Sequence, residues 1–151
     1  MQKKEKLIIF GNGELAEVAH FYLTNDSSYE VVAFTVDSQY IAENKFMNLP
    51  LIPFKDIEIV YPPSEYKMFI AIAYKNLNKL RAEKYRQAKE KGYSLITYIH
   101  SKSVISNNVE IGDNCFILEN QTIQPFVKIG NNVIIWSGNH IGHHVTIKDH
   151  C

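Results

Sequence analysis

An isoleucine at every sixth position constrains the last third of the chain more than any other feature. The recurrence runs without exception through Ile99, Ile105, Ile111, Ile117, Ile123, Ile129, Ile135, Ile141 and Ile147. A period of six with buried aliphatic residues is typical of a parallel β-helix, in which each coil buries its apolar face only by stacking on its neighbours. We therefore predict a β-helix over residues 98–151, with three hexads in each triangular coil.

Stacking of such coils places every residue above the residue three hexads earlier. One predicted inward corner carries Ser103, Gln121 and Asn139, and two others carry the columns Val109, Val127, Val145 and Cys115, Val133, Cys151. Polar groups inside a stack must form hydrogen bonds with one another, and stacked amides can do so between coils. We therefore interpret Gln121 and Asn139 as structural residues.

The first 97 residues follow a different pattern, in which strands and helices alternate. Apolar runs at 6–10, 29–36, 68–73 and 94–98 predict four strands, and helical spacing of apolar residues predicts helices over 14–23 and 76–91 with a shorter one from Phe54. Residues 51–53 belong to a less regular stretch. The alternation favours a small parallel α/β domain, which binds ligands at the carboxyl ends of its strands.

Charge and targeting features narrow the choice of partners. Basic and acidic residues both number 16, so no net field attracts nucleic acid or an anionic membrane. The apolar run Leu7–Phe10 is too short for a signal peptide or a membrane span, which favours a cytoplasmic protein with no membrane insertion. Cys115 and Cys151 are then expected to be reduced.

Three of the six histidines lie close together on the predicted β-helix, at His140, His143 and His144. His143 and His144 fall at an outward turn, where the previous coil has Pro125 and Phe126. Imidazole is the natural general base near neutral pH, so the cluster indicates acid–base chemistry. Exposed imidazoles could instead bind zinc with a neighbouring subunit, as in γ-class carbonic anhydrases, although no metal is our main expectation.

Four segments together resemble a known family: Phe10–Val18, Val31–Asp37, Phe69–Tyr74 and Ile135–Asp149. The chain is similar to the hexapeptide-repeat sugar acetyltransferases that include the sialic acid O-acetyltransferases and the bacillosamine-pathway N-acetyltransferase. The resemblance implies a left-handed β-helix, a Rossmann-like domain over 1–97 that binds a nucleotide-linked sugar, and a homotrimer. It also implies acetyl-CoA as cosubstrate and acyl transfer to a sugar amine or hydroxyl in cell-surface glycan biosynthesis.

The family pattern assigns roles to particular positions of this chain. By resemblance, Gly11, Asn12 and Gly13 lie against the nucleotide or its phosphates, since glycines let backbone amides approach an anion at a helix start. Asp37 then accepts hydrogen bonds from a ribose or a base, where the family has an acidic pair and this chain has Val36–Asp37. Tyr74 and Lys75 are further substrate-binding candidates at the same edge. A plain tight turn and a surface carboxylate are the alternatives for these glycines and for Asp37.

His143 matches the catalytic histidine of the family, which removes a proton from the attacking sugar amine or hydroxyl. Close relatives have a carboxylate at the next position to orient the imidazole, and this chain has His144 there. His140, Asp149 or a different partner could orient His143 instead. His140 also lies in a segment similar to the Asn-His element of the hexapeptide antibiotic acetyltransferases, so it is the second candidate base.

The chain ends at Cys151, within its ninth hexad, whereas relatives continue for several coils. A truncated chain is therefore expected, in which the β-helix is incomplete and coenzyme A contacts are missing. The alternative function is a nucleotide-sugar-binding and trimerisation module that does not turn over substrate.

Overall fold

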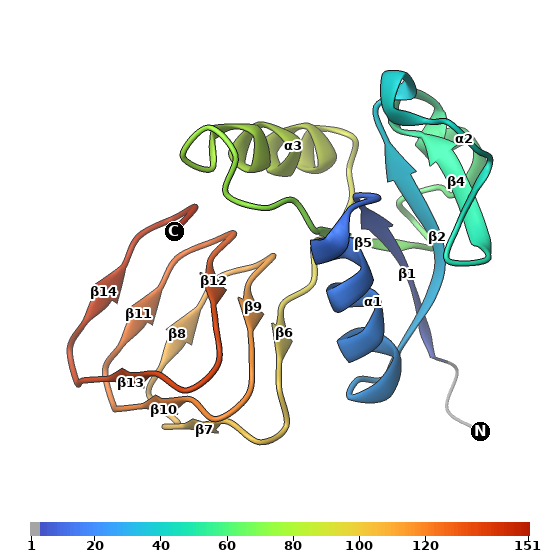
Figure 1. The fold of residues 1–151 in the computed structure, drawn as a ribbon. Coiled ribbons are helices and arrows are strands. Elements are labelled where there is room, and N and C mark those ends of the chain that lie inside the picture. The colour runs from blue at the N-terminus through green and yellow to red at the C-terminus, as the bar shows by residue number, and fades with distance from the viewer. Residues whose placement is uncertain (1–3) are drawn as a thin grey trace. The chain divides into compact units, whose positions relative to one another are not determined.

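The computed structural model describes residues 4–151 and divides the chain into two compact units, Met1–Leu95 and Ile96–Cys151. The first unit contains a five-stranded sheet in the order β3-β4-β2-β1-β5 (Figure 1). Strands β1 (Glu5–Phe10), β2 (Tyr29–Val36), β4 (Leu49–Pro53) and β5 (Lys67–Ile70) are parallel, and the short β3 (Lys45–Phe46) pairs antiparallel with β4. The expected parallel α/β arrangement is therefore present in this unit.

Two long helices, α1 (Glu14–Asn25) and α3 (Lys79–Glu90), accompany the sheet, together with the short α2 (Ile57–Val60). Single 3-10 turns, η1 (Ser38–Tyr40) and η2 (Phe54–Asp56), follow β2 and β4. Among residues 4–151, no helix has the length and apolar character needed to cross a bilayer.

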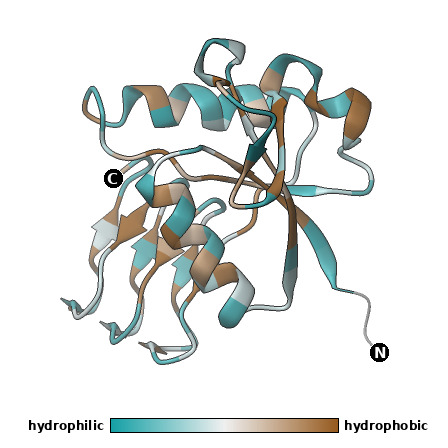
Figure 2. Ribbon diagram, turned by 45° about the vertical axis from the view of Figure 1, so that its right-hand side comes forward, coloured by the Kyte–Doolittle hydropathy of each residue, from teal (hydrophilic) through white to brown (hydrophobic). Residues whose placement is uncertain are grey.

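Alternation along β1 buries both faces of the sheet. Ile8 and Phe10 join one core cluster with Ile57 of α2 and Ala88 of α3. Leu7 and Ile9 are also fully buried and point to the opposite face, because successive strand residues alternate. Figure 2 shows the resulting hydrophobic colour along the strands and mixed colour along the long helices. The sheet is thus an internal layer, as the continuous apolar runs predict.

Three predictions for this unit are wrong in detail. The predicted strand over 94–98 contributes only an isolated bridge between Leu95 and Met68, because the chain leaves the sheet there. The fourth parallel strand is instead β4, where Pro50 and Pro53 hid a strand in a stretch interpreted as irregular. The helix predicted from residue 76 begins at Lys79, since residues 76–78 have a left-handed backbone.

The second unit is a parallel β-helix of two-residue strands. They are β6 (Tyr98–Ile99), β7 (Val104–Ile105), β8 (Glu110–Ile111), β9 (Phe116–Ile117), β10 (Thr122–Ile123), β11 (Lys128–Ile129), β12 (Ile134–Ile135), β13 (His140–Ile141) and β14 (Thr146–Ile147). They form three parallel sheets, β12-β9-β6, β13-β10-β7 and β14-β11-β8, which make the three sides of the triangular coils in Figure 1. Pairing of Ile105 with Ile123, and of Ile123 with Ile141, confirms the predicted stacking of coils.

Aliphatic side chains fill the interior of the coils. Ile117, Ile123, Val127 and Val133 are buried almost completely, and the inward column members Val145 and Cys151 on the last coil are exposed. Each strand contributes one inward isoleucine, so a coil that lacks a neighbour leaves its apolar face uncovered.

The predicted polar ladder is also present. The buried Gln121 amide donates to the carbonyl oxygens of Leu118 at 3.0 Å and of Trp136 at 2.6 Å. Its Oε1 atom accepts a hydrogen bond from the backbone N–H of Asn139 at 3.1 Å. Because these bonds join successive coils, the structural interpretation of Gln121 is confirmed.

A second feature of the β-helix was not predicted. Every sixth residue from 114 to 150 has a positive φ, between 50° and 79°; these residues are Asn114, Asn120, Phe126, Asn132, Gly138, His144 and His150. Asparagine and glycine adopt this left-handed conformation most readily, so the frequent Asn at these corners has a conformational cause. Phe126, His144 and His150 are the bulky exceptions, and the first two share one corner.

Candidate functional site

The histidine cluster of the second unit separates into a pair and an isolated member. His143 and His144 occupy the corner that follows β13, and both side chains are exposed. Their Nδ1 atoms lie 3.0 Å apart, and the two rings are perpendicular with centroids separated by 5.2 Å. A contact of this length between two imidazole nitrogens requires that one nitrogen donates a proton and the other accepts it. In the neutral state one of the two Nδ1 atoms therefore carries the proton of this hydrogen bond, and the other ring carries its proton on Nε2.

The coil beneath holds this corner in place. The backbone N–H of His143 donates to Oε1 of Gln124 at 2.9 Å, and the N–H of His144 donates to the Pro125 carbonyl at 3.3 Å. The His144 ring lies over the Phe126 ring, with centroids 4.9 Å apart and planes inclined by 36°. Phe126 and His144, whose backbones both have a positive φ, are thus in contact through their tilted rings.

The remaining orienting candidates lie elsewhere on the β-helix. His140 belongs to β13 and pairs in register with Thr122 of β10. Asp149 follows β14 at a different corner, where its Oδ1 accepts a hydrogen bond from the backbone N–H of Asn131 at 2.7 Å. The structure therefore brings His144, and neither His140 nor Asp149, into hydrogen-bond contact with His143.

No group of three or more His, Cys, Asp or Glu side chains in residues 4–151 is arranged to hold a metal ion. Burial raises the pKa of the Cys115 thiol, whose Sγ atom lies 3.1 Å from the carbonyl oxygen of Gly130. Cys115 is consequently a protonated packing residue, since a thiol needs a lowered pKa to act as a nucleophile or ligand.

The second candidate region is the carboxyl edge of the sheet in the first unit. The strand order reverses between β1 and β5, and such a reversal is where open parallel sheets bind ligands. Gly11 follows β1 with a φ of 139°, and a Cβ atom there would lie 2.6 Å from the Ala71 carbonyl oxygen. Only glycine fits this position, because the ends of β1 and β5 approach closely.

The other two residues of the turn differ from Gly11. Asn12 donates its side-chain amide to the Tyr40 carbonyl at 3.1 Å, so its side chain supports the turn after β2. Gly13 is the exposed N-cap of α1, and a Cβ atom built there would meet nothing within 4 Å. The start of α1 therefore presents an open, positively polarised end to solvent.

Asp37 has a partner that the sequence did not reveal. It follows β2, and its two carboxylate oxygens lie 2.9 Å and 2.8 Å from Nζ of Lys84 on α3. Lys84 is only 6% exposed, and its ammonium group lies 5.8 Å from the centroid of the Phe10 ring. The carboxylate of Asp37 thus compensates a buried cation, and its side chain keeps 27% exposure for a ligand.

Tyr74 and Lys75 lie beyond the end of β5, on the loop that leads to α3, and both are exposed. Three successive residues after them, Asn76, Leu77 and Asn78, have φ values of 53°, 53° and 62°. This left-handed run turns the chain into α3.

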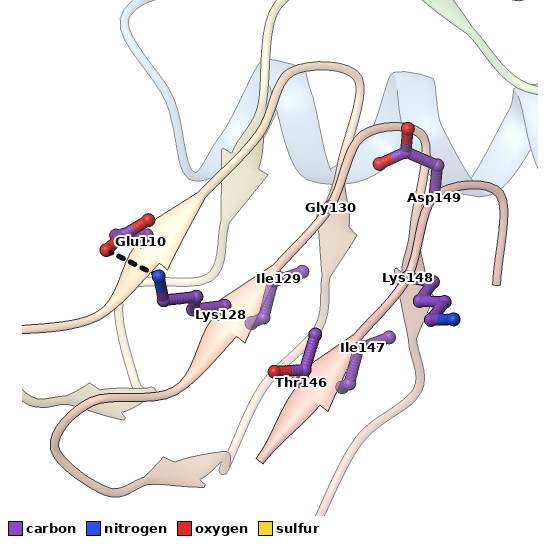
Figure 3. A pocket seen from close by; sticks show the side chains of 8 residues that line it. All are labelled: Glu110, Lys128, Ile129, Gly130, Thr146, Ile147, Lys148 and Asp149. Carbon is purple, nitrogen blue, oxygen red and sulfur yellow. Dashed lines mark ion pairs between the residues drawn. The ribbon is translucent and has the colours of Figure 1, made fainter. Parts of the chain in front are cut away.

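A shallow depression that the sequence pattern does not predict lies on the outer face of the sheet β14-β11-β8 (Figure 3). Its volume is about 560 Å³, and Lys128 crosses it toward Glu110, with Nζ 3.5 Å from the carboxylate. Lys148 and Asp149 also line it, together with Thr146 and the strand residues Ile129 and Ile147. The outward residues of a β-helix have no six-residue signature, so this depression could not be predicted from the sequence.

No protein-family model and no curated protein matches the chain. Solved structures do match. A variant of perosamine N-acetyltransferase from Caulobacter crescentus, in complex with CoA and GDP-perosamine, shares 22% identity over 97% of this chain with a TM-score of 0.81. The acetyltransferase domain of PglB from Neisseria gonorrhoeae shares 20% identity over 95% of this chain with a TM-score of 0.80.

The chain covers 67% and 68% of those two proteins, so it spans about two thirds of their length. The PglB domain has also been solved with acetyl coenzyme A, at 16% identity and a TM-score of 0.79. These likenesses establish that the chain has the fold of hexapeptide-repeat sugar acetyltransferases.

Proposed function

We propose that this chain is part of a sugar acetyltransferase that moves an acetyl group from acetyl-CoA to an amine or hydroxyl of a nucleotide-linked sugar. The observation that carries the proposal is the exposed His143–His144 pair on a β-helix of this fold. Two structural neighbours, crystallised with CoA and GDP-perosamine or with acetyl coenzyme A, support the choice of substrates.

In this proposal His143 acts as general base. Its imidazole removes a proton from the sugar nitrogen or oxygen as that atom attacks the thioester carbonyl carbon of acetyl-CoA. The carbon–sulfur bond breaks, the sugar keeps the acetyl group, and the proton leaves with coenzyme A as its thiol. No covalent enzyme intermediate is needed, because positioning of the two substrates lowers the barrier to direct attack.

The first unit is proposed to act as a Rossmann-like domain that binds the nucleotide-linked sugar. Its four parallel strands have the order β4-β2-β1-β5, which corresponds to 3-2-1-4 in chain order and agrees with half of a doubly wound sheet. The uncapped start of α1 at Gly13 favours phosphate, and the exposed part of Asp37 favours ribose hydroxyls. Asn12, Tyr74 and Lys75 remain candidate contacts, and a homotrimer is the proposed assembly.

Release of free thiol from acetyl-CoA tests this function. We expect release with at least one member of a panel of nucleotide-linked amino sugars, assayed on this chain and on a chain extended by the downstream coding sequence. Thermal stabilisation by the sugar nucleotides without thiol release from either chain would instead support a binding and trimerisation module. Sedimentation of the same samples measures the oligomeric state of the chain and tests the proposed homotrimer.

A further inference from the structure

We propose that His144 is the positioning residue that fixes the tautomer of His143. This inference rests on the proposed function and adds to it a role for a neutral imidazole. The hydrogen bond between the two Nδ1 atoms at 3.0 Å has two possible directions. Only one of them leaves a lone pair on Nε2 of His143.

The direction of this hydrogen bond determines which nitrogen of each ring carries a proton. If His143 donates its Nδ1–H to His144, then Nε2 of His143 is free to accept a proton from the substrate. His144 must then offer its Nδ1 lone pair and carry its own proton on Nε2. When His143 has taken up the substrate proton, it still donates Nδ1–H to His144, so the hydrogen bond persists through the transfer. A neutral acceptor thus does what a carboxylate does beside other catalytic histidines.

The surroundings of His144 suit a fixed acceptor. Its ring stacks on Phe126, and its backbone occupies a left-handed corner with a φ of 62°. Phe126 occupies the same corner one coil earlier with a φ of 66°, so this corner accommodates a bulky aromatic side chain. Stacking and backbone together restrict how the His144 ring can turn away from His143.

The corner supplies its own test variants. His144→Phe keeps an aromatic ring that the backbone accepts, as Phe126 shows, and removes the acceptor nitrogen. His144→Glu restores an acceptor, in the form of a carboxylate. His150→Asn is the matched control, because it changes a histidine at another left-handed corner to the residue that Asn114 and Asn132 already provide in that column.

The decisive measurement is the imidazole ¹⁵N spectrum of the labelled chain near neutral pH, which reports the protonated nitrogen of each ring. We expect His143 to carry its proton on Nδ1 and His144 on Nε2, both unchanged in His150→Asn. In His144→Phe we expect the proton of His143 to move largely to Nε2. The kcat for acetyl transfer should fall roughly ten- to a hundredfold with little change in KM, and His144→Glu should restore most of it.

A wild-type spectrum with the His143 proton on Nε2 overturns the inference, as does a His144→Phe variant with unchanged tautomer and unchanged kcat. The spectrum does not depend on turnover, so the role of His144 and the proposed function can be contradicted separately. Thiol release with the wrong tautomer contradicts only the role of His144. The expected tautomers without acetyl transfer, in this chain and in the extended one, contradict the proposed function and hence any catalytic role for the pair.

Discussion

Gly11 and Gly13 belong to one turn, yet different physical constraints act on them. Gly11 has a φ of 139° and no room for a Cβ atom, whereas Gly13 has a φ of −111° and open space around it. The fold therefore explains Gly11 by itself. It does not explain Gly13, where a larger N-cap residue would fit and would stabilise the helix.

Substitutions at Gly13 test whether the start of α1 binds phosphate. Asn and Asp are equally good N-caps, so Gly13→Asn and Gly13→Asp should both keep or slightly raise the free energy of unfolding. Only Asp adds a negative charge. We expect Gly13→Asp to weaken binding of a nucleoside diphosphate sugar at least tenfold more than Gly13→Asn does, measured by titration calorimetry. Equal affinities for the two variants would remove the phosphate from this position.

Gly11→Ala is the structural counterpart of that experiment. Strain at positive φ and the contact with the Ala71 carbonyl should lower the free energy of unfolding by about 1–3 kcal/mol or more. Urea unfolding measures the change. A variant as stable as the wild type would contradict the close approach of β1 and β5.

Cys115 gives the second unit a sensitivity to alkali. Burial raises the pKa of its thiol above the ordinary value of 9.0, so the unfolded chain ionises this thiol at a lower pH than the folded chain does. The Cys115 contribution to stability is therefore complete below about pH 9 and declines as the pH rises from there toward the folded pKa. Cys115→Val introduces the residue that the same column has at Val133. As the pH rises above about 9, the free energy of unfolding of this variant should fall less than that of the wild type. Parallel losses in both proteins would refute this assignment.

At the scale of elements, the period of six predicted the β-helix because the coil repeats one simple rule. Every strand of the β-helix is only two residues long and carries one inward isoleucine. The six-residue period therefore does not depend on which residues occupy the outer face. The left-handed corners were missed, although the recurring asparagines are their visible signal. In the α/β unit, β4 was missed because proline is rare in strands, and the apolar run over 94–98 joins the sheet only through one bridge.

Loss of the Gln121 hydrogen bonds should lower the stability of the β-helix. Gln121→Leu removes the amide donor to the Leu118 and Trp136 carbonyls, which keep bonds from Ser103 and Asn139, and it removes the acceptor of the Asn139 N–H. We expect a loss of about 1–3 kcal/mol in the free energy of unfolding. The neighbouring Thr122 points outward and is exposed, so Thr122→Val should change it by less than about 0.5 kcal/mol. Similar unfolding curves for the two variants would contradict the ladder.

At the scale of the molecule, the sequence predicted a parallel α/β unit and a β-helix, and the histidine corner was identified by clustering and by the family resemblance. The side-chain contacts of the candidate site residues could not be predicted from the sequence. Lys84 reaches Asp37 from another element, 47 residues along the chain, and the His143–His144 hydrogen bond depends on ring orientations. Side-chain partners across elements have no periodic signature, so they become visible only in the folded chain.

The acetylated nucleotide-linked sugar is the product that the proposed function predicts. Mass spectrometry of the nucleotide-linked sugar after incubation with acetyl-CoA measures it directly, in this chain and in the chain extended downstream. We expect the sugar to gain one acetyl group with wild-type His143 and to gain none, or at least a hundredfold less, with His143→Ala. Equal acetylation by the His143→Ala variant would contradict the role of His143 as general base, and no acetylated sugar from any wild-type chain across the panel would contradict acetyl transfer itself.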